Sequence, residues 1–197
     1  MSQERNCLCT KERVTVLTKT QTLGRLELLK TVALRMNGQM RACAAWSAIE
    51  EHDKILDMAC GEGALLQHLS EKYRLTVCGM CDSPDKARIA RERLGDADVV
   101  PGRLEDIPWR NDTFDIVMLP SVIRGDARRI FDEALRVLKE GGQMTVAASI
   151  FKMRLESEVS RRELMRLMQE AGFQDVTFRT SGFYGAISGW KKRQMPC

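Results

Sequence analysis

The sequence is poor in the features that mark membrane, secreted and repeat proteins. No apolar run approaches the roughly 18 residues of a candidate membrane-spanning helix, and residues 1–13 are polar, unlike a signal peptide. Internal repeats and low-complexity segments are also lacking. These absences predict a cytoplasmic protein that works without a membrane, and a length of 197 residues suits one domain with a sizeable core.

Cysteine pairs that would form a disulfide framework or a zinc site are not apparent. The cysteine count of seven is odd, and Cys60, Cys78 and Cys81 fall in a glycine-rich turn and an apolar run, where small core residues are expected. Cys78 and Cys81 have the spacing of zinc ligands, but no second pair accompanies them. We predict reduced thiols and no metal site. Cys7 and Cys9 leave open a soft metal or metalloid, with an incidental pair as the favoured alternative.

The charge pattern does not indicate a nucleic-acid partner. Lys and Arg number 31 against 27 Asp and Glu, which gives a net charge of +4. The excess comes from short clusters such as Arg161–Arg162 and Lys191–Arg193 rather than from a basic stripe. We therefore expect that the protein does not bind nucleic acid.

Residues 54–69 have the pattern of a strand, a tight turn and a helix. Ile55 and Leu56 open a short apolar run, the turn residues Ala59, Gly61 and Gly63 have no bulky side chains, and leucines follow at helical spacing. A turn of this kind lets the backbone approach a ligand closely. It also points the free N–H groups of the new helix at that ligand.

A second apolar strand, residues 75–81, ends at an acidic residue. Asp82 lies about twenty residues beyond the glycines, the spacing at which an acid after the second strand can accept hydrogen bonds from both hydroxyls of a ribose. Ser83 and Pro84 then have the residue types of a helix cap and a first helical position. These residues predict a ribose site at the end of the second strand.

Strand-like and helical segments alternate along the rest of the chain. Apolar spacing predicts two helices within residues 23–46, with Asn37–Gly38 as a break, and a helix from Pro84 to Leu94. The later segments read as strands 98–100, 114–119, 143–148, 176–178 and 185–190, and as helices after Asp126, closed by Gly141–Gly142, and at 158–171. This alternation predicts a doubly wound α/β sheet with a closing hairpin.

The order of these motifs resembles a known family. The turn 56–63, Asp82, and the segments 105–109, 112–117 and 135–142 are similar in sequence and spacing to class I S-adenosylmethionine-dependent methyltransferases of the small-molecule kind, methyltransferase type 11. The resemblance covers about residues 54–149. It implies a Rossmann-like doubly wound seven-stranded sheet with the last strand antiparallel, plus N-terminal helices. Residues 1–50 would form an N-terminal arm and helical cap, and residues 51–197 the methyltransferase domain, together one compact unit.

The resemblance also implies an activity and a set of site residues. The activity is methylation of a small-molecule acceptor with S-adenosyl-L-methionine as the cofactor. The implied cofactor-binding residues are Asp57, Ala59, Cys60, Gly61, Gly63, Asp82, Ser83, Leu104, Glu105 and Leu119. Asp82 would hold the ribose, and Asp57 would engage the amino group of the cofactor or act only in ordering the turn. Candidate acceptor contacts are Ser121, Arg124 and Tyr184, with Trp190 as a further candidate and ordinary surface or core roles as alternatives.

Two positions depart from the family pattern. Arg103 stands where the family has an acid near the adenine amino group, so adenine recognition would rest on the Leu104 backbone, on Glu105 or on apolar packing. Ala59 replaces the usual first glycine. Methyl transfer is an in-line displacement that positioning and desolvation can promote, so no catalytic base is assigned. Residues 119–121 lack the Asn/Asp-Pro-Pro-Tyr type of motif, which argues against DNA-adenine or glutamine acceptors.

Two other functions stay open on the sequence. One is a non-catalytic S-adenosylmethionine-binding or regulatory protein, which Arg103 keeps in consideration. The other is a nicotinamide-dependent oxidoreductase, whose Gly-x-Gly-x-x-Gly pattern would fall on Ala59, Gly61 and Ala64, a poor match. The acceptor, its methylated atom and the oligomeric state are open as well, with a homodimer as one option.

Overall fold

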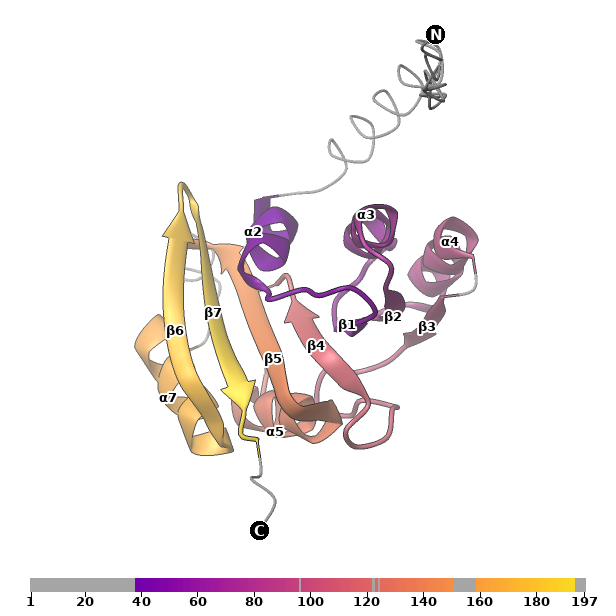
Figure 1. Ribbon diagram of the computed structural model, residues 1–197. Coiled ribbons are helices and arrows are strands. Elements are labelled where there is room, and N and C mark those ends of the chain that lie inside the picture. Colours follow the sequence, from indigo (N-terminus) through magenta and orange to yellow (C-terminus); the bar gives the residue numbers. More distant parts are fainter. Residues whose placement is uncertain (1–37, 96, 122, 124, 151–158, 194–197) are drawn as a thin grey trace, which may run out of the picture.

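A twisted sheet forms the centre of the protein (Figure 1), whose computed structural model describes residues 38–95, 97–121, 123, 125–150 and 159–193. Within these ranges the sheet has seven strands in the order β3-β2-β1-β4-β5-β7-β6. The strands are β1 (Lys54–Asp57), β2 (Thr76–Cys81), β3 (Asp98–Pro101), β4 (Phe114–Leu119), β5 (Leu138–Ser149), β6 (Phe173–Ser181) and β7 (Tyr184–Lys191). Strands β1 to β5 pair in parallel, whereas β7 is antiparallel to β5 and β6. The expected α/β sheet with an antiparallel last strand is confirmed.

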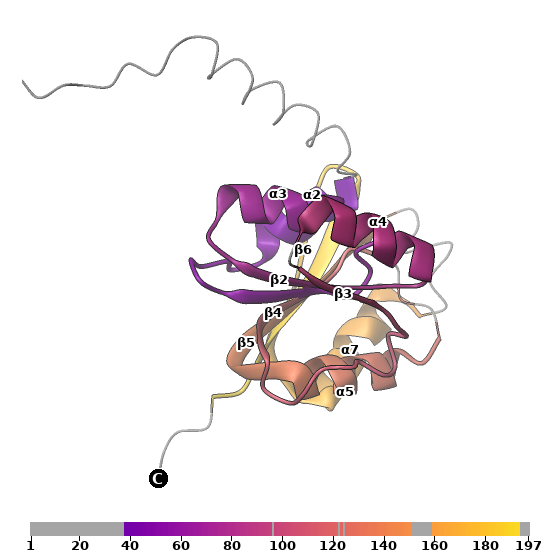
Figure 2. The same cartoon turned by 90° about the vertical axis from the view of Figure 1, so that its right-hand side faces the viewer.

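Helices cover both faces of this sheet (Figures 1 and 2). Helices α2 (Gly38–Trp46), α3 (Ala64–Lys72) and α4 (Pro84–Leu94) lie on one face, and α5 (Ala127–Val137) and α7 (Arg161–Ala171) lie on the other. In β1, Ile55 belongs to the buried cluster on the α2 side and Leu56 to the cluster on the α5 side. Consecutive side chains alternate between the faces because the strand is pleated.

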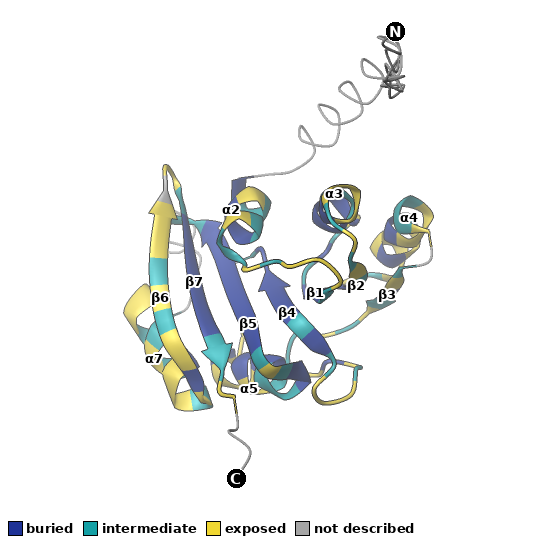
Figure 3. Ribbon diagram, viewed as in Figure 1, coloured by how far each residue is buried: buried dark blue, intermediate teal, exposed yellow. Residues whose placement is uncertain are grey.

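The central strands are buried on both faces (Figure 3). Ile116 to Leu119 in β4 and Gly142 to Ala148 in β5 form uninterrupted buried runs. A parallel strand covered by helices on both sides is buried at successive positions, so β4 is apolar from Ile116 to Leu119. Strand β5 also buries two polar residues, Gln143 and Thr145. Because β1 pairs in parallel with both β2 and β4, the carboxyl ends of these three strands lie along one edge of the sheet.

Three helices begin where a side chain accepts a hydrogen bond from the first turn. Ser83, Asp126 and Ser160 each accept from the backbone N–H three residues later, at the starts of α4, α5 and α7. Pro84 follows Ser83 at the first position of α4. The predicted cap at Ser83 is confirmed, and the helix expected after Asp126 begins there with Asp126 as its cap.

One predicted boundary is wrong. The glycine pair 141–142 was expected to close a helix, but α5 ends at Val137 and the glycines lie inside β5. The β4–β5 ladder shifts register at this point, and Gly141 has a φ of 75°. The glycines therefore permit an irregularity at the start of a strand rather than a helix end.

The closing hairpin is longer than the sequence predicted. Strands β6 and β7 extend beyond 176–178 and 185–190 because the backbone ladder continues through polar residues of the edge strand β6. The ladder shifts register between Gln174 and Thr177, where Asp175 has a φ of 50°, so β6 contains a bulge. Helix α7 begins at Arg161 rather than at residue 158.

Part of the predicted N-terminal cap belongs to the described structure. Helix α2 is the second of the two helices predicted before Trp46 and begins at Gly38. The predicted arm, the first of those helices, and Cys7 and Cys9 lie outside the described residues. Within the described ranges, no helix is long and apolar enough to cross a bilayer, and no group of His, Cys, Asp and Glu side chains could hold a metal ion.

Candidate active site

The turn after β1 is fixed by backbone hydrogen bonds to the strands on both sides. The N–H of Met58 donates to the Met118 carbonyl at 2.8 Å, in β4. The N–H of Cys60 donates to the Met80 carbonyl at 2.9 Å, in β2. The turn is therefore held in one conformation at the carboxyl edge of the sheet.

Two glycines of this turn have left-handed backbone conformations and different surroundings. Gly61 has a φ of 53°, and a Cβ placed on it would meet no atom within 4 Å. Gly63 has a φ of 81°, and a Cβ there would lie 2.9 Å from Leu94 Cδ1 of α4. Gly63 also precedes α3 without a side-chain cap, which leaves that helix end to other acceptors. Gly61 thus faces open space, and Gly63 permits close packing of α3 on α4.

Asp57 is fully buried at the end of β1. Its Oδ1 accepts the Ala59 N–H at 3.0 Å, whereas its Oδ2 has no hydrogen-bond partner in the described part of the chain. Burial raises the pKa of Asp57 to about 7, and the Ala59 N–H opposes this shift. Because an unpaired buried oxygen is costly, Oδ2 would gain from a ligand that donates a hydrogen bond.

Asp82 follows β2 and differs from Asp57 in exposure, with 75% of its side chain accessible. Lys86 Nζ donates to both carboxylate oxygens, at 2.9 and 3.1 Å, and this pairing lowers the pKa of Asp82. Ser83 rather than Asp82 caps α4, and its hydroxyl accepts the Lys86 N–H. Asp82 is therefore a charged acceptor at the edge of the sheet.

Arg103, after β3, stands where an acid was expected. Its side chain is 83% exposed, and its Nε lies 3.7 Å from Glu105 Oε2. Leu104 packs against the buried cluster on the α5 side. A Cβ on Gly125 would lie 2.9 Å from Glu105 Oε1, so Glu105 borders the segment after β4. Arg103 extends into solvent while Leu104 and Glu105 point toward the protein.

Residues 119–121, at the end of β4 and directly after it, form the floor of the candidate site. Leu119 and Pro120 are buried, and Ser121 is half-buried. The Pro120 carbonyl accepts a hydrogen bond from Gln39 Nε2 of α2 at 2.9 Å. Arg124, a predicted acceptor contact, lies outside the described residues.

A second contact joins α2 to the sheet near Asp57. The thiol of Cys43, fully buried, donates to the Thr145 carbonyl at 3.4 Å. Burial, and then the charge of Asp57, raises the pKa of Cys43. The sequence interpretation missed Gln39 and Cys43, although their four-residue spacing places them on the same side of a helix.

Tyr184 lies at the same edge, opposite Ser149 at the end of β5. Its ring occupies the space that a Cβ on Gly38 would need, and with α2 it lines a cavity of about 390 Å³. The expectation for Trp190 is wrong, because it pairs with Gln143 near the opposite edge of the sheet. Because β7 runs antiparallel to β5, its first residue lies beside the carboxyl end of β5 and Trp190 lies beside the amino-terminal part of β5.

The carboxyl edge of the sheet thus combines an open glycine turn with two carboxyl groups, one buried and one exposed. Asp82 can accept hydrogen bonds from hydroxyl groups in solvent, and Asp57 can accept one more in a buried position. The backbone at Gly61 can approach a ligand without a side chain in the way. Together these groups suit a ligand with a diol, a donor group and an extended shape.

Comparison with family models gives a match over residues 56–146, to a family described as a methyltransferase domain. The matched range begins in β1 and ends in β5. It contains the turn, Asp82, the Arg103 segment and the floor.

The curated relatives include several methyltransferases, of which two illustrate the overlap. A demethylmenaquinone methyltransferase of Thermotoga maritima is 31% identical over 97 residues, which span 48% of this chain and 42% of the relative. A chloroplastic 2-methyl-6-phytyl-1,4-hydroquinone methyltransferase of Oryza sativa is 30% identical over 149 residues, which span 66% of this chain and 43% of the relative. The chain therefore spans less than half the length of these two proteins.

Solved structures share the fold at lower identity. A methyltransferase of Thermotoga maritima, described as a possible histamine N-methyltransferase, has a TM-score of 0.63 and 23% identity, with 88% of this chain and 96% of that chain covered. The geranyl diphosphate C-methyltransferase of Streptomyces coelicolor, solved with S-adenosyl-L-homocysteine, has a TM-score of 0.65 and 15% identity over 78% of this chain and 75% of that chain. These similarities concern the arrangement of helices and strands.

Proposed function

We propose that this chain, which belongs to the class I S-adenosylmethionine-dependent methyltransferases, transfers a methyl group from S-adenosylmethionine to a small-molecule acceptor. The observation that carries the proposal is the open turn at Gly61 between buried Asp57 and exposed Asp82. The turn and both acids lie inside the segment that matches the family.

The residues at this edge fit the chemical parts of the cofactor. Asp82 can accept hydrogen bonds from both ribose hydroxyls once it releases Lys86, and Asp57 Oδ2 can accept one from the amino group. Leu104 and Glu105 are the residues that we propose to hold the adenine, and the buried Leu119 is proposed to lie beneath the cofactor. Of the other residues predicted for the cofactor, Ala59, Cys60 and Gly63 shape the turn, and Ser83 holds the start of α4.

The cofactor supplies a methyl group on a positively charged sulfur, which leaves as a neutral thioether. This displacement asks the protein to align the acceptor and to exclude water rather than to provide a strong base. The buried floor at Leu119 and Pro120, with α2 attached above it, gives a water-poor surface for this step. We assign no general base.

For the acceptor we propose a small molecule that enters between α2 and the floor, near Ser121 and Tyr184. The names of two relatives point to quinone-type acceptors, a demethylmenaquinone and a phytyl hydroquinone. Hydroquinones are therefore the first acceptors to test here. Arg124 remains a proposed contact.

The proposal extends to the setting in which the enzyme works. Four buried free cysteines, Cys43, Cys60, Cys78 and Cys81, support a reducing and thus cytoplasmic environment. We propose that residues 1–50 act as a cap on the domain 51–197. That the protein binds no nucleic acid stays a prediction, and a homodimer stays one option.

Calorimetric titration of the purified protein with S-adenosylhomocysteine, and separately with NAD, tests the cofactor. We expect binding of S-adenosylhomocysteine alone. Binding of NAD alone would support an oxidoreductase, and binding of neither would contradict the proposal.

Turnover separates an enzyme from a non-catalytic binding protein. With S-adenosylmethionine and a panel of hydroquinones, we expect formation of S-adenosylhomocysteine that depends on the acceptor. Tight cofactor binding without turnover on any small molecule would favour the regulatory alternative.

A further inference from the structure

A second cavity lies between α2 and α3, away from the glycine turn. Its volume is about 180 Å³, below the roughly 300–1,000 Å³ of pockets for drug-sized ligands. The residues that line it come from α2, from the C-terminal half of α3 and from the segments that follow these helices: Arg41, Ala44, Ala45, Ile49, His68, Leu69, Lys72 and Tyr73. The cavity therefore suits a ligand smaller than a drug-sized molecule.

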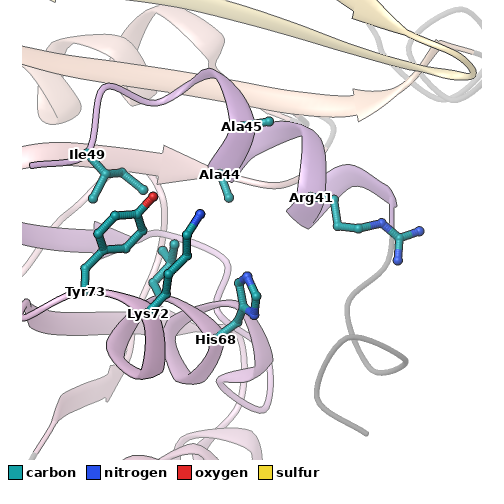
Figure 4. A pocket seen from close by; sticks show the side chains of 8 residues that line it. Arg41, Ala44, Ala45, Ile49, His68, Lys72 and Tyr73 are labelled. Atoms are coloured by element: carbon teal, nitrogen blue, oxygen red, sulfur yellow. The ribbon is translucent and has the colours of Figure 1, made fainter. Parts of the chain in front are cut away.

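The two sides of the cavity differ in chemistry (Figure 4). The α2 side is apolar, with Ala44, Ala45 and Ile49. The α3 side presents His68 and Lys72, and both side chains point from α3 toward α2. Tyr73 stands beside them below Ile49. The cavity therefore offers polar donors opposite an apolar wall.

The ionisable groups with a permanent charge that line this cavity are positive, Arg41 and Lys72. None of the lining residues is acidic. Lys72 Nζ lies 4.9 Å from the centre of the Tyr73 ring, and among the described residues it has no carboxylate partner. The Arg41 guanidinium also lines the cavity but is turned outward in Figure 4, so it adds positive charge at the mouth.

Like Lys72, His68 has a polar group without a hydrogen-bond partner among the described residues. Its Nδ1 is buried and has no hydrogen-bond partner among the described residues. A buried polar atom without a partner is uncommon and points to a hydrogen-bonding group outside the described residues, such as a ligand. The imidazole and the Tyr73 hydroxyl can each donate one hydrogen bond.

We propose that the α2–α3 cavity is a second ligand site, which binds a small organic carboxylate. Lys72 supplies the opposite charge, His68 and Tyr73 supply hydrogen bonds, and the alanines and Ile49 contact the carbon body of the ligand. Carboxylates are preferred over inorganic phosphate because half of the cavity is apolar and would leave phosphate oxygens without donors. The inference does not depend on the methyltransferase activity.

The test is a two-dimensional NMR titration of the full chain with sodium benzoate, with benzamide as the neutral analogue of the same shape. We expect saturable shifts of the Ala45, Leu69 and Tyr73 amide signals with benzoate and none with benzamide. Lys72→Gln should weaken benzoate binding about tenfold or more, the scale of one charge-assisted hydrogen bond. Tyr73→Phe, which removes only the hydroxyl, should weaken it by a smaller factor.

Lys192→Gln is the matched control, because it removes one exposed positive charge near the end of β7. It should leave benzoate binding unchanged, and thermal unfolding should confirm that all variants fold. Equal weakening by Lys72→Gln and Lys192→Gln, or equal binding of benzamide, would overturn the proposal. Tighter binding of inorganic phosphate than of benzoate would overturn the assignment to carboxylates.

Discussion

At the scale of single residues, Asp57 contributes to the way in which stability depends on pH. Its pKa is raised to about 7 in the folded protein, from an ordinary value near 4. Between pH about 4 and 7 the folded state keeps a proton that the unfolded state releases, so the free energy of unfolding falls as pH rises through this window. Below it the contribution is fully present.

We expect Asp57→Asn to flatten this pH dependence, because an amide does not titrate in this range. The measurement is urea unfolding of both proteins at several pH values across the window. The difference between the curves should reach at most about 4 kcal/mol at its upper end. Parallel curves would show that Asp57 is ionised in the folded protein throughout.

Asp82 carries the prediction for ribose binding. Asp82→Ala should weaken S-adenosylhomocysteine binding by about 1–3 kcal/mol, the scale of losing a partner for polar groups. Asp85→Ala is the control, because Asp85 is an exposed acid in the first turn of α4 and its loss changes the net charge equally. Calorimetric titration of both variants measures the loss of S-adenosylhomocysteine affinity. Equal losses in the two variants would show that Asp82 does not bind the ribose.

Gly61 tests whether the open space beside the turn belongs to the cofactor. Gly61→Ala should reduce cofactor affinity about tenfold or more, because the new methyl group would enter that space and clash with the ligand. Gly182→Ala in the β6–β7 turn is the matched control, since Gly182 has a φ of 56° and is also open. Both variants should lose similar stability, but only the first should lose affinity in a calorimetric titration.

Several of these residues were predictable because local chemistry fixes their place. Asp57 ends β1, Gly61 lies in the turn that follows it, and Asp82 comes directly after β2, so their spacing follows from the strand-turn-helix pattern. Gln39 and Cys43 were missed because their partners, Pro120 and Thr145, lie far away in the sequence. A sequence pattern does not show contacts of this range.

At the scale of the elements, the packing of α3 on α4 depends on Gly63. Gly63→Ala should lower the free energy of unfolding by about 1–3 kcal/mol, because backbone strain adds to an overlap with Leu94. Gly61→Ala has the strain without the overlap, so the difference between the two variants measures the packing contribution. Urea unfolding provides both values, and equal losses would mean that Leu94 moves aside at little cost.

The helices and strands were predicted well where a run of apolar residues defines them. They were predicted poorly where backbone hydrogen bonds to a neighbouring strand define them. Strand β4 was predicted with its observed bounds because Phe114–Leu119 is buried on both faces. The long strand β6 was mostly missed, since its exposed polar residues are held by pairing with β7. The start of β5 was misread because its glycines resemble a helix end.

At the scale of the whole molecule, helix α2, which is the described helix of the predicted cap, packs into the hydrophobic core of the domain. Ala42 and Cys43 of α2 belong to the same buried cluster as Ile55, Met118 and Ala147. We therefore expect α2 and the sheet to unfold together. Nothing in this packing suggests that residues 1–50 and 51–197 separate at α2.

A variant with Trp46 as its sole tryptophan tests this expectation. Trp109→Phe and Trp190→Phe remove the other two, and Trp46 at the end of α2 then reports on that helix alone. The urea midpoint from its fluorescence should coincide with the midpoint from far-ultraviolet circular dichroism. An earlier fluorescence transition would show that the cap unfolds as a separate unit.

The bulge in β6 has a consequence for how copies of the protein meet. A long flat strand at the rim of a sheet is a template onto which a second chain can add and start an aggregate. In β6 that row of backbone groups is interrupted at Asp175, where the register shifts, and the rim carries the exposed charge of Arg179. Sheet-to-sheet fusion along this rim is therefore disfavoured, and concentrated solutions should stay free of fibres.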